Sequence, residues 1–146
     1  MNILYIHQYF STPRTTVGSR SYYICQELIR RGHVVTMLTM EDKALVRVRR
    51  TTIDGIHVVY MRGSYSQAFG IARRVFSFIS FMLKSTILPM REKDVDLVIA
   101  TSTPLTVSFP ALILRKFEKT HFIFEVRDLL PEAPIQMGGL KNKFLI

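Results

Sequence analysis

The sequence has a single cysteine and no long apolar run. Cys25 alone excludes an intramolecular disulfide and a cysteine-rich metal site, and this usage fits a reducing, cytoplasmic compartment. The N-terminus, from Met1 to His7, lacks the basic region and small-residue cleavage site of a signal peptide. No stretch approaches the roughly 18 uninterrupted apolar residues of a membrane span. We therefore expect a globular protein without a membrane-spanning helix.

Glycine is scarce where dinucleotide-binding proteins need it. The pattern Gly-x-Gly-x-x-Gly should directly follow the first strand, but only Gly18 occurs between the first predicted strand and the first predicted helix. The P-loop pattern is absent as well, and no nucleophile triad is visible. NAD and FAD are therefore disfavoured, and we expect neither a cofactor nor a metal.

Acidic residues are scarce in the middle of a chain whose net charge is +9. Between Lys43 and Lys84 the only acid is Asp54. The basic residues of this segment are Lys43, Arg47, Arg49, Arg50, Arg62, Arg73, Arg74 and Lys84. Such a field attracts nucleic acid, anionic lipid or phosphorylated substrates. Because no DNA- or RNA-binding motif occurs, we expect no nucleic-acid partner.

Apolar runs alternate with helical patterns along the chain. Strands are predicted over residues 2–7, 33–39, 95–101 and 121–126, with a hairpin or bent strand over 51–61 around Asp54-Gly55. Helices are predicted over 19–31, 70–88 and 102–119. Gly32 is expected to end the first helix in the αL conformation, and Thr103-Pro104 to start the last one, which Pro110 distorts. The charged segment 40–50 is expected to be mobile. Strands that are apolar throughout predict an α/β fold in one domain, with helices on both faces of a parallel sheet.

The most informative stretch ends the last predicted strand, where Arg127 and Asp128 come just before Pro131 stops further pairing. In open parallel sheets, ligands bind outside the carboxyl ends of the strands. Asp128 could accept a hydrogen bond from a sugar hydroxyl or act as a base, or it could form a structural pair with Arg127. His7 ends the first strand and could line the same crevice, or serve as a structural histidine.

The start of the first helix is a second candidate site. Backbone N–H groups at Gly18, Ser19 and Arg20 could bind a phosphate, and the Arg20 guanidinium could add a charged donor. Alternatively, Gly18 only permits the turn and Arg20 is solvated.

The predicted helix over 70–88 is apolar on most of its circumference. Its polar residues Arg73, Ser77, Ser80 and Lys84 form one narrow stripe. Either the helix is buried against the sheet or another domain, or it dips into a membrane interface with its basic residues near anionic headgroups. In the second case, Phe78 and Phe81 are expected to insert into the lipid.

Taken in order, five segments resemble the N-terminal domain of family 4 glycosyltransferases, particularly bacterial members that add amino sugars in O-antigen and capsule synthesis. The segments are His7-Gln-Tyr-Phe, Gly18-Ser-Arg-Ser-Tyr-Tyr, Arg31-Gly-His-Val-Val-Thr, Ala100-Thr-Ser-Thr-Pro-Leu-Thr and Glu125-Val-Arg-Asp-Leu-Leu-Pro-Glu-Ala-Pro. The chain departs from the family at Val17, where many relatives have glycine. It also departs at Arg127, where many have the histidine that acts at the reaction centre.

The resemblance implies a GT-B fold, in which two Rossmann-like domains face each other across a cleft. Residues 1–146 would be the acceptor-side domain of a retaining, metal-independent transferase, without the domain that binds most of the nucleotide-sugar. The acceptor would be a saccharide or lipid-linked, such as a polyprenyl diphosphate at the cytoplasmic membrane face. Asp128 would be the catalytic contact, and the substrate-binding residues would be His7, Gly18, Ser19, Arg20, Arg127 and Glu132.

With the donor-binding domain missing, we expect little or no turnover from the isolated chain. The alternative is a naturally separate, non-catalytic subunit that docks on an anionic membrane and recruits a donor-binding chain.

Overall fold

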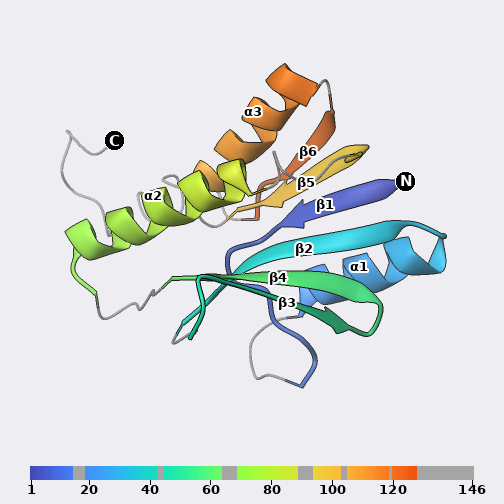
Figure 1. Ribbon diagram of the computed structural model, residues 1–146, viewed down its shortest axis with the longest axis horizontal. Coiled ribbons are helices and arrows are strands. Elements are labelled where there is room, and N and C mark those ends of the chain that lie inside the picture. The colour runs from blue at the N-terminus through green and yellow to red at the C-terminus, as the bar shows by residue number, and fades with distance from the viewer. Residues whose placement is uncertain are drawn as a thin grey trace.

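The computed structural model describes residues 1–14, 19–42, 45–63, 69–88, 94–102, 105–118 and 120–127. Its centre is a six-stranded sheet in the order β3-β4-β2-β1-β5-β6 (Figure 1). The strands are β1 Asn2–Ile6, β2 Val34–Glu41, β3 Val48–Ile53, β4 Ile56–Arg62, β5 Leu97–Thr101 and β6 His121–Glu125. All neighbours pair in parallel except β3, which is antiparallel to β4 at one edge.

Helices cover both faces of this sheet, as the apolar strands predict (Figure 1). They are α1 Arg20–Arg30, α2 Ile71–Ile87, α3 Ser108–Glu118 and the short 3-10 helix η2 Leu105–Val107. Alternate residues of β1 enter different cores. Ile3 and Tyr5 pack with Cys25 of α1, whereas Leu4 and Ile6 pack on the face of α2 and α3. The predicted α/β fold with a mostly parallel sheet is confirmed.

Two turns form where the sequence places their signals. Gly32 ends α1 at φ +83°, and the backbone N–H groups of Gly32 and His33 donate to Ile29 and Leu28, which closes the helix end. Asp54 and Gly55 both have positive φ and connect the paired residues 53 and 56, so the predicted hairpin of β3 and β4 is confirmed.

The prediction of one mobile segment over residues 40–50 is wrong at both ends. Met40 and Glu41 continue β2, and β3 begins at Val48. A contact distant in sequence holds the two ends together: the Arg49 guanidinium binds both carboxylate oxygens of Glu41 and lies 4.2 Å from the centre of the Tyr60 ring. Glu41 and Arg49, two of the charged residues that suggested a loop, thus form an ion pair between β2 and β3.

The third predicted helix begins differently from its sequence pattern. Thr103 and Pro104, the predicted helix start, lie outside the described residues, and the chain then forms η2 before α3. Pro110 consequently lies in the first turn of α3, where a proline interrupts no hydrogen bond of the helix. The change from 3-10 to α geometry lies between Val107 and Ser108, and α3 continues through Pro110 to Glu118.

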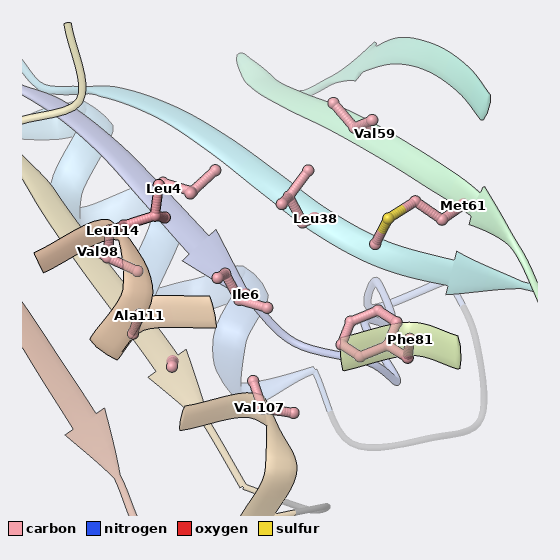
Figure 2. Packing of buried hydrophobic residues seen from close by; sticks show 11 residues of the cluster. Leu4, Ile6, Leu38, Val59, Met61, Phe81, Val98, Val107, Ala111 and Leu114 are labelled. Carbon is pink, nitrogen blue, oxygen red and sulfur yellow. The ribbon is translucent and has the colours of Figure 1, made fainter. Parts of the chain in front are cut away.

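Helix α2 reverses the polarity of an ordinary surface helix. Its buried residues are Ser77, Phe81, Ser85 and Thr86, and its exposed apolar residues are Val75, Phe76, Ile79, Leu83 and Ile87. Phe81 enters the core beside Met61 and Leu38 (Figure 2), so its predicted insertion into lipid is wrong. Because three of the four buried residues carry a hydroxyl, α2 presents its apolar side outward.

Candidate functional site

A polar cluster lies at the carboxyl edge of the sheet, where β1 and β5 end. The chain passes from β1 to β2 on one side of β1, whereas β5 and β6 lie on the other side. This reversal makes the space outside the ends of β1 and β5 the topological switch point, where open α/β sheets bind ligands. His7 follows β1, Ser102 follows β5 and Arg127 follows β6, so the three side chains come from adjacent strand ends.

His7 is the centre of this cluster and is only 3% exposed. Its Nδ1 lies 2.8 Å from Ser21 Oγ, and its Nε2 lies 3.3 Å from Arg127 Nη1. Because a guanidinium only donates hydrogen bonds, Nε2 must be the acceptor, and the proton of the neutral ring resides on Nδ1 and points to Ser21. Both ring nitrogens are therefore occupied by protein partners.

The pKa of His7 is lowered from 6.5 to about 4. Burial disfavours the imidazolium, the positive charge of Arg127 lowers the pKa further, and Glu125 opposes both effects. His7 is thus a neutral ring at physiological pH that fixes the orientation of Arg127. The Arg127 backbone N–H donates to Ser102 Oγ at 2.8 Å, which holds the same residue from a second direction.

Glu125 gathers the remaining polar groups. Its carboxylate accepts hydrogen bonds from Thr101 and, at 3.2 Å, from the Tyr5 hydroxyl, and Arg20 Nη2 lies 3.1 Å from Oε1. Burial, more than any other cause, raises the pKa of Tyr5 to about 12, so this phenol stays a donor. The strand end is therefore fixed by three elements: β1, β5 and the start of α1.

Of the predicted site residues, the structure places His7 in contact with Arg127 and Arg20 in contact with Glu125. Arg20 uses its charge on Glu125, although the sequence suggested a phosphate or solvent. Ser19 immediately precedes α1, but its side chain makes no capping hydrogen bond. The other predicted site residues, Gly18, Asp128 and Glu132, lie outside the described residues.

Sequence reasoning missed Tyr5, Ser21, Thr101 and Ser102 as members of this cluster. Tyr5 carried a weak signal, because it is the one residue with a hydroxyl within an otherwise apolar strand. Thr101 and Ser102 carried another, because hydroxyl residues directly follow the apolar run Leu97–Ala100. Ser21 lies on a helix and becomes recognisable only when α1 packs beside β1.

A second polar region lies at the same carboxyl edge, beyond β2. Arg62 ends β4, and it lines a cavity of about 420 Å³ together with Lys84 and Ser77 of α2. The sequence placed Ser77 and Lys84 in one polar stripe. In the structure Ser77 is buried, whereas Arg73 and Lys84 are exposed and line the same cavity as Arg62.

Comparison with known proteins identifies the fold. No protein-family model and no curated protein matches the sequence. A solved structure described as "Trehalose-6-phosphate from E. coli bound with UDP-2-fluoro glucose" is similar, with a TM-score of 0.57 and 12% identity over 96% of this chain. That protein is a glycosyltransferase of the GT-B fold. The likeness establishes the fold: this chain has the architecture of one Rossmann-like half of GT-B, and it spans 38% of the length of that structure.

The described residues contain neither a membrane-spanning helix nor a metal-binding cluster. No described helix is both long and apolar enough to cross a membrane. No group of three or more histidine, cysteine, aspartate or glutamate side chains is arranged within the described residues to hold a metal ion.

Proposed function

We propose that this chain is the acceptor-binding half of a retaining glycosyltransferase. The complete enzyme would move a sugar from a nucleotide-sugar to a lipid-linked or saccharide acceptor at the cytoplasmic face of the membrane, in the synthesis of a cell-surface polysaccharide. The resemblance to family 4 and the GT-B-like half-fold support this assignment. The donor-binding half would be a separate segment or chain.

The observation that carries the proposal is Arg127 at the switch point, where its guanidinium contacts His7 and its backbone N–H donates to Ser102. Sugar transfer from a nucleotide-sugar develops negative charge on the leaving phosphate, and a preorganised cation stabilises that charge without rearrangement. Because His7 is neutral, its ring contacts the Arg127 guanidinium without repelling it. The chain contributes positioning and electrostatics, and Asp128 is the proposed contact to the reacting sugars.

The test measures variants of the complete enzyme, in which a donor-binding half is supplied by the rest of the gene or by a neighbouring gene. Asp128→Asn and Arg127→Gln should each lower kcat of the complete enzyme by at least about tenfold, since preorganised charge and hydrogen-bond donors stabilise the transition state strongly. Asp54→Asn, remote from the crevice and bonded to Tyr22, is the matched control. Unchanged kcat in both crevice variants would contradict the proposal.

A second candidate function, a non-catalytic docking subunit, is favoured by the outward apolar face of α2. Phe76 is 72% exposed, and Ile79, Leu83 and Ile87 continue the same helix face. Basic residues Arg73 and Lys84 flank this face on the same helix. An apolar helix face with cationic flanks is typical of a segment that lies in an anionic membrane interface.

Flotation with vesicles containing phosphatidylglycerol tests this docking. The wild-type chain should float, and Phe76→Glu combined with Leu83→Glu should release it, because both side chains point outward and the fold does not need them. Tyr23→Glu is the matched control, since Tyr23 is 60% exposed and lies on α1, which covers the opposite face of the sheet from α2. Equal flotation of wild type and double variant would remove the basis for docking through α2.

A further inference from the structure

The cavity between β4 and α2 has the walls of an anion site. Three cations line it: Arg62, Arg73 and Lys84. Asp42 is the carboxylate in the same wall. None of the three cations forms a salt bridge with a carboxylate of the described residues. The positive charge of this wall therefore exceeds its negative charge and is not neutralised by ion pairs within the described chain.

The contacts of these cations concentrate their charge. Lys84 Nζ donates to the Arg62 carbonyl oxygen at 2.6 Å, which holds the two residues together. Burial lowers the pKa of Lys84, and the nearby charges of Arg62 and Arg47 lower it further. Arg73 lies in the first turn of α2, at the positive end of the helix dipole, where a cation is disfavoured. The Arg73 guanidinium lies 3.8 Å from the centre of the Phe69 ring. A bound anion would offset the repulsion between Lys84 and the neighbouring arginines and the unfavourable position of Arg73 in the helix dipole.

Ser77 supplies an independent sign of a missing ligand. This residue lines the cavity and is 6% exposed, and its Oγ has no hydrogen-bond partner among the described residues. The neighbouring buried hydroxyls of α2 behave differently, because Ser85 donates to the Phe81 carbonyl at 2.7 Å and Thr86 to the Met82 carbonyl at 2.8 Å. Burying a hydroxyl without a partner is costly. An acceptor oxygen placed in the cavity would satisfy Ser77.

The same cations border an apolar cavity. Arg62 and Lys84 also line a second space of about 440 Å³, whose other walls include Val48, Met61, Ile87 and Leu88. A ligand whose anionic group sits among the cations can thus place an apolar chain directly beside them. Neither a free phosphate nor an uncharged lipid would use both spaces.

We propose that this pair of cavities binds a phosphate or diphosphate group carried on an apolar chain. The phosphate oxygens accept hydrogen bonds from Ser77 and charge-assisted bonds from Arg62, Arg73 and Lys84, and the chain lies along Met61, Ile87 and Leu88. That this amphiphile is the acceptor of sugar transfer rests on the proposed function. The site itself follows from the cavity walls.

The position of the site fits an acceptor. β4 and β1 are separated by β2 alone, so their ends lie about 10 Å apart laterally, given the usual spacing of neighbouring strands. An amphiphile anchored at the end of β4 can therefore direct a group on its phosphate toward the crevice at the end of β1, where His7 and Arg127 lie.

Calorimetric titration of the complete chain tests the site with three probes: farnesyl diphosphate, inorganic diphosphate and farnesol. Farnesyl diphosphate should bind at least about tenfold more tightly than inorganic diphosphate, because only it buries apolar surface. Ser77→Ala should weaken both anionic probes by about tenfold, the usual effect of losing a hydrogen bond to a charged group. Ser85→Ala is the matched control and should leave both affinities unchanged.

Further variants separate the two parts of the site. Arg73→Gln combined with Lys84→Gln should abolish measurable binding of both anions, whereas Ile87→Asn should weaken farnesyl diphosphate and spare inorganic diphosphate. Thermal unfolding verifies that each variant is folded. Wild-type affinity in folded Ser77→Ala would overturn the anion site, and equal affinities of the two anionic probes would overturn the amphiphile.

Failure of this binding site and failure of the proposed glycosyltransferase function give different results. The probes carry no sugar, so Arg127→Gln should bind them as the wild type does. Probe binding without sugar transfer by the complete enzyme would leave this site standing and reject the proposed function. Sugar transfer by the complete enzyme, together with probe binding that does not depend on Ser77, Arg73 or Lys84, would support the proposed function and reject this site.

Discussion

Two polar regions share the carboxyl edge of the sheet, and they differ in how their charges are satisfied. Around Glu125, the polar groups are paired: Arg20 and Tyr5 bind its carboxylate, and His7 bridges Ser21 and Arg127. Around Ser77, cations gather without ion pairs in the described residues, and a buried hydroxyl has no partner.

This difference separates two uses of polar residues. A fully bonded cluster stabilises the fold and fixes the orientation of the groups within it. A cluster with crowded like charges and an unsatisfied hydroxyl loses stability unless a ligand completes it. The first region therefore positions Arg127. The second region is the stronger candidate for binding a ligand, because its cations and its hydroxyl group match an anion.

The largest expected effect is that of Glu125→Ala on stability. The substitution removes the carboxylate that accepts from Tyr5 and Thr101 and leaves these hydroxyl groups only their mutual contact at 3.4 Å, so the free energy of unfolding should fall by about 3 kcal/mol. Urea denaturation measures the change. The control is Glu27→Ala, which removes exposed ion pairs to Arg30 and Arg31 on α1 and should leave stability close to wild type. Equal losses in the two variants would show that the Glu125 cluster is not the stabilising one.

The next effect is the pH dependence contributed by His7. Its pKa is about 4 in the folded protein and 6.5 in the unfolded chain, so only the unfolded chain takes up a proton between these values. The His7 contribution to stability is thus complete above pH 6.5 and falls by up to about 3 kcal/mol as the pH approaches 4.

His7→Gln provides the reference for that measurement. Glu125 and Arg127 face the ring in the wild type, and both remain in the variant, so the difference between the two pH profiles isolates the imidazole. Urea unfolding at intervals from pH 7 to pH 4 should show the wild type losing stability faster than the variant. Parallel profiles would contradict the assignment of His7 as a buried neutral ring.

The smallest expected effect compares two buried serines of α2. Without ligand, Ser77→Ala should raise the free energy of unfolding by roughly 1 kcal/mol, because it removes an unsatisfied hydroxyl and adds a better helix former. Ser85→Ala should gain less, because it removes two hydrogen bonds to the helix backbone. A stabilising change that weakens ligand binding is typical of a functional site. Destabilisation by Ser77→Ala would mean that Ser77 has a structural partner.

Most of the fold could be predicted because its signals are local. Apolar runs identified β1, β5 and β6, Gly32 identified the end of α1, and Asp54-Gly55 identified the hairpin. The start of β3 was missed because its charged residues are held by a partner on another strand, as Arg49 is by Glu41. Local composition does not contain that contact.

The site was predictable in its location but not in its connections. A strand end carrying Arg127 pointed to the carboxyl edge, but the bond between Tyr5 and Glu125 joins residues 120 positions apart and depends on strand order. The orientation of α2 was equally hidden, because a helix with four polar residues in a stripe can turn that stripe outward or inward. Only packing against η2 and α3 decides that Ser77 faces the protein.

Sugar transfer with the donor-binding half present and absent tests the central claim most directly. Radiolabelled nucleotide-sugars would be offered with a prenyl-diphosphate-linked sugar as acceptor, and the label in the lipid phase would be measured. We expect little or no transfer by the 146-residue chain alone, and transfer with retained anomeric configuration once the donor-binding half is supplied. Full transfer by the isolated chain, or none from any nucleotide-sugar in the presence of both halves, would contradict it.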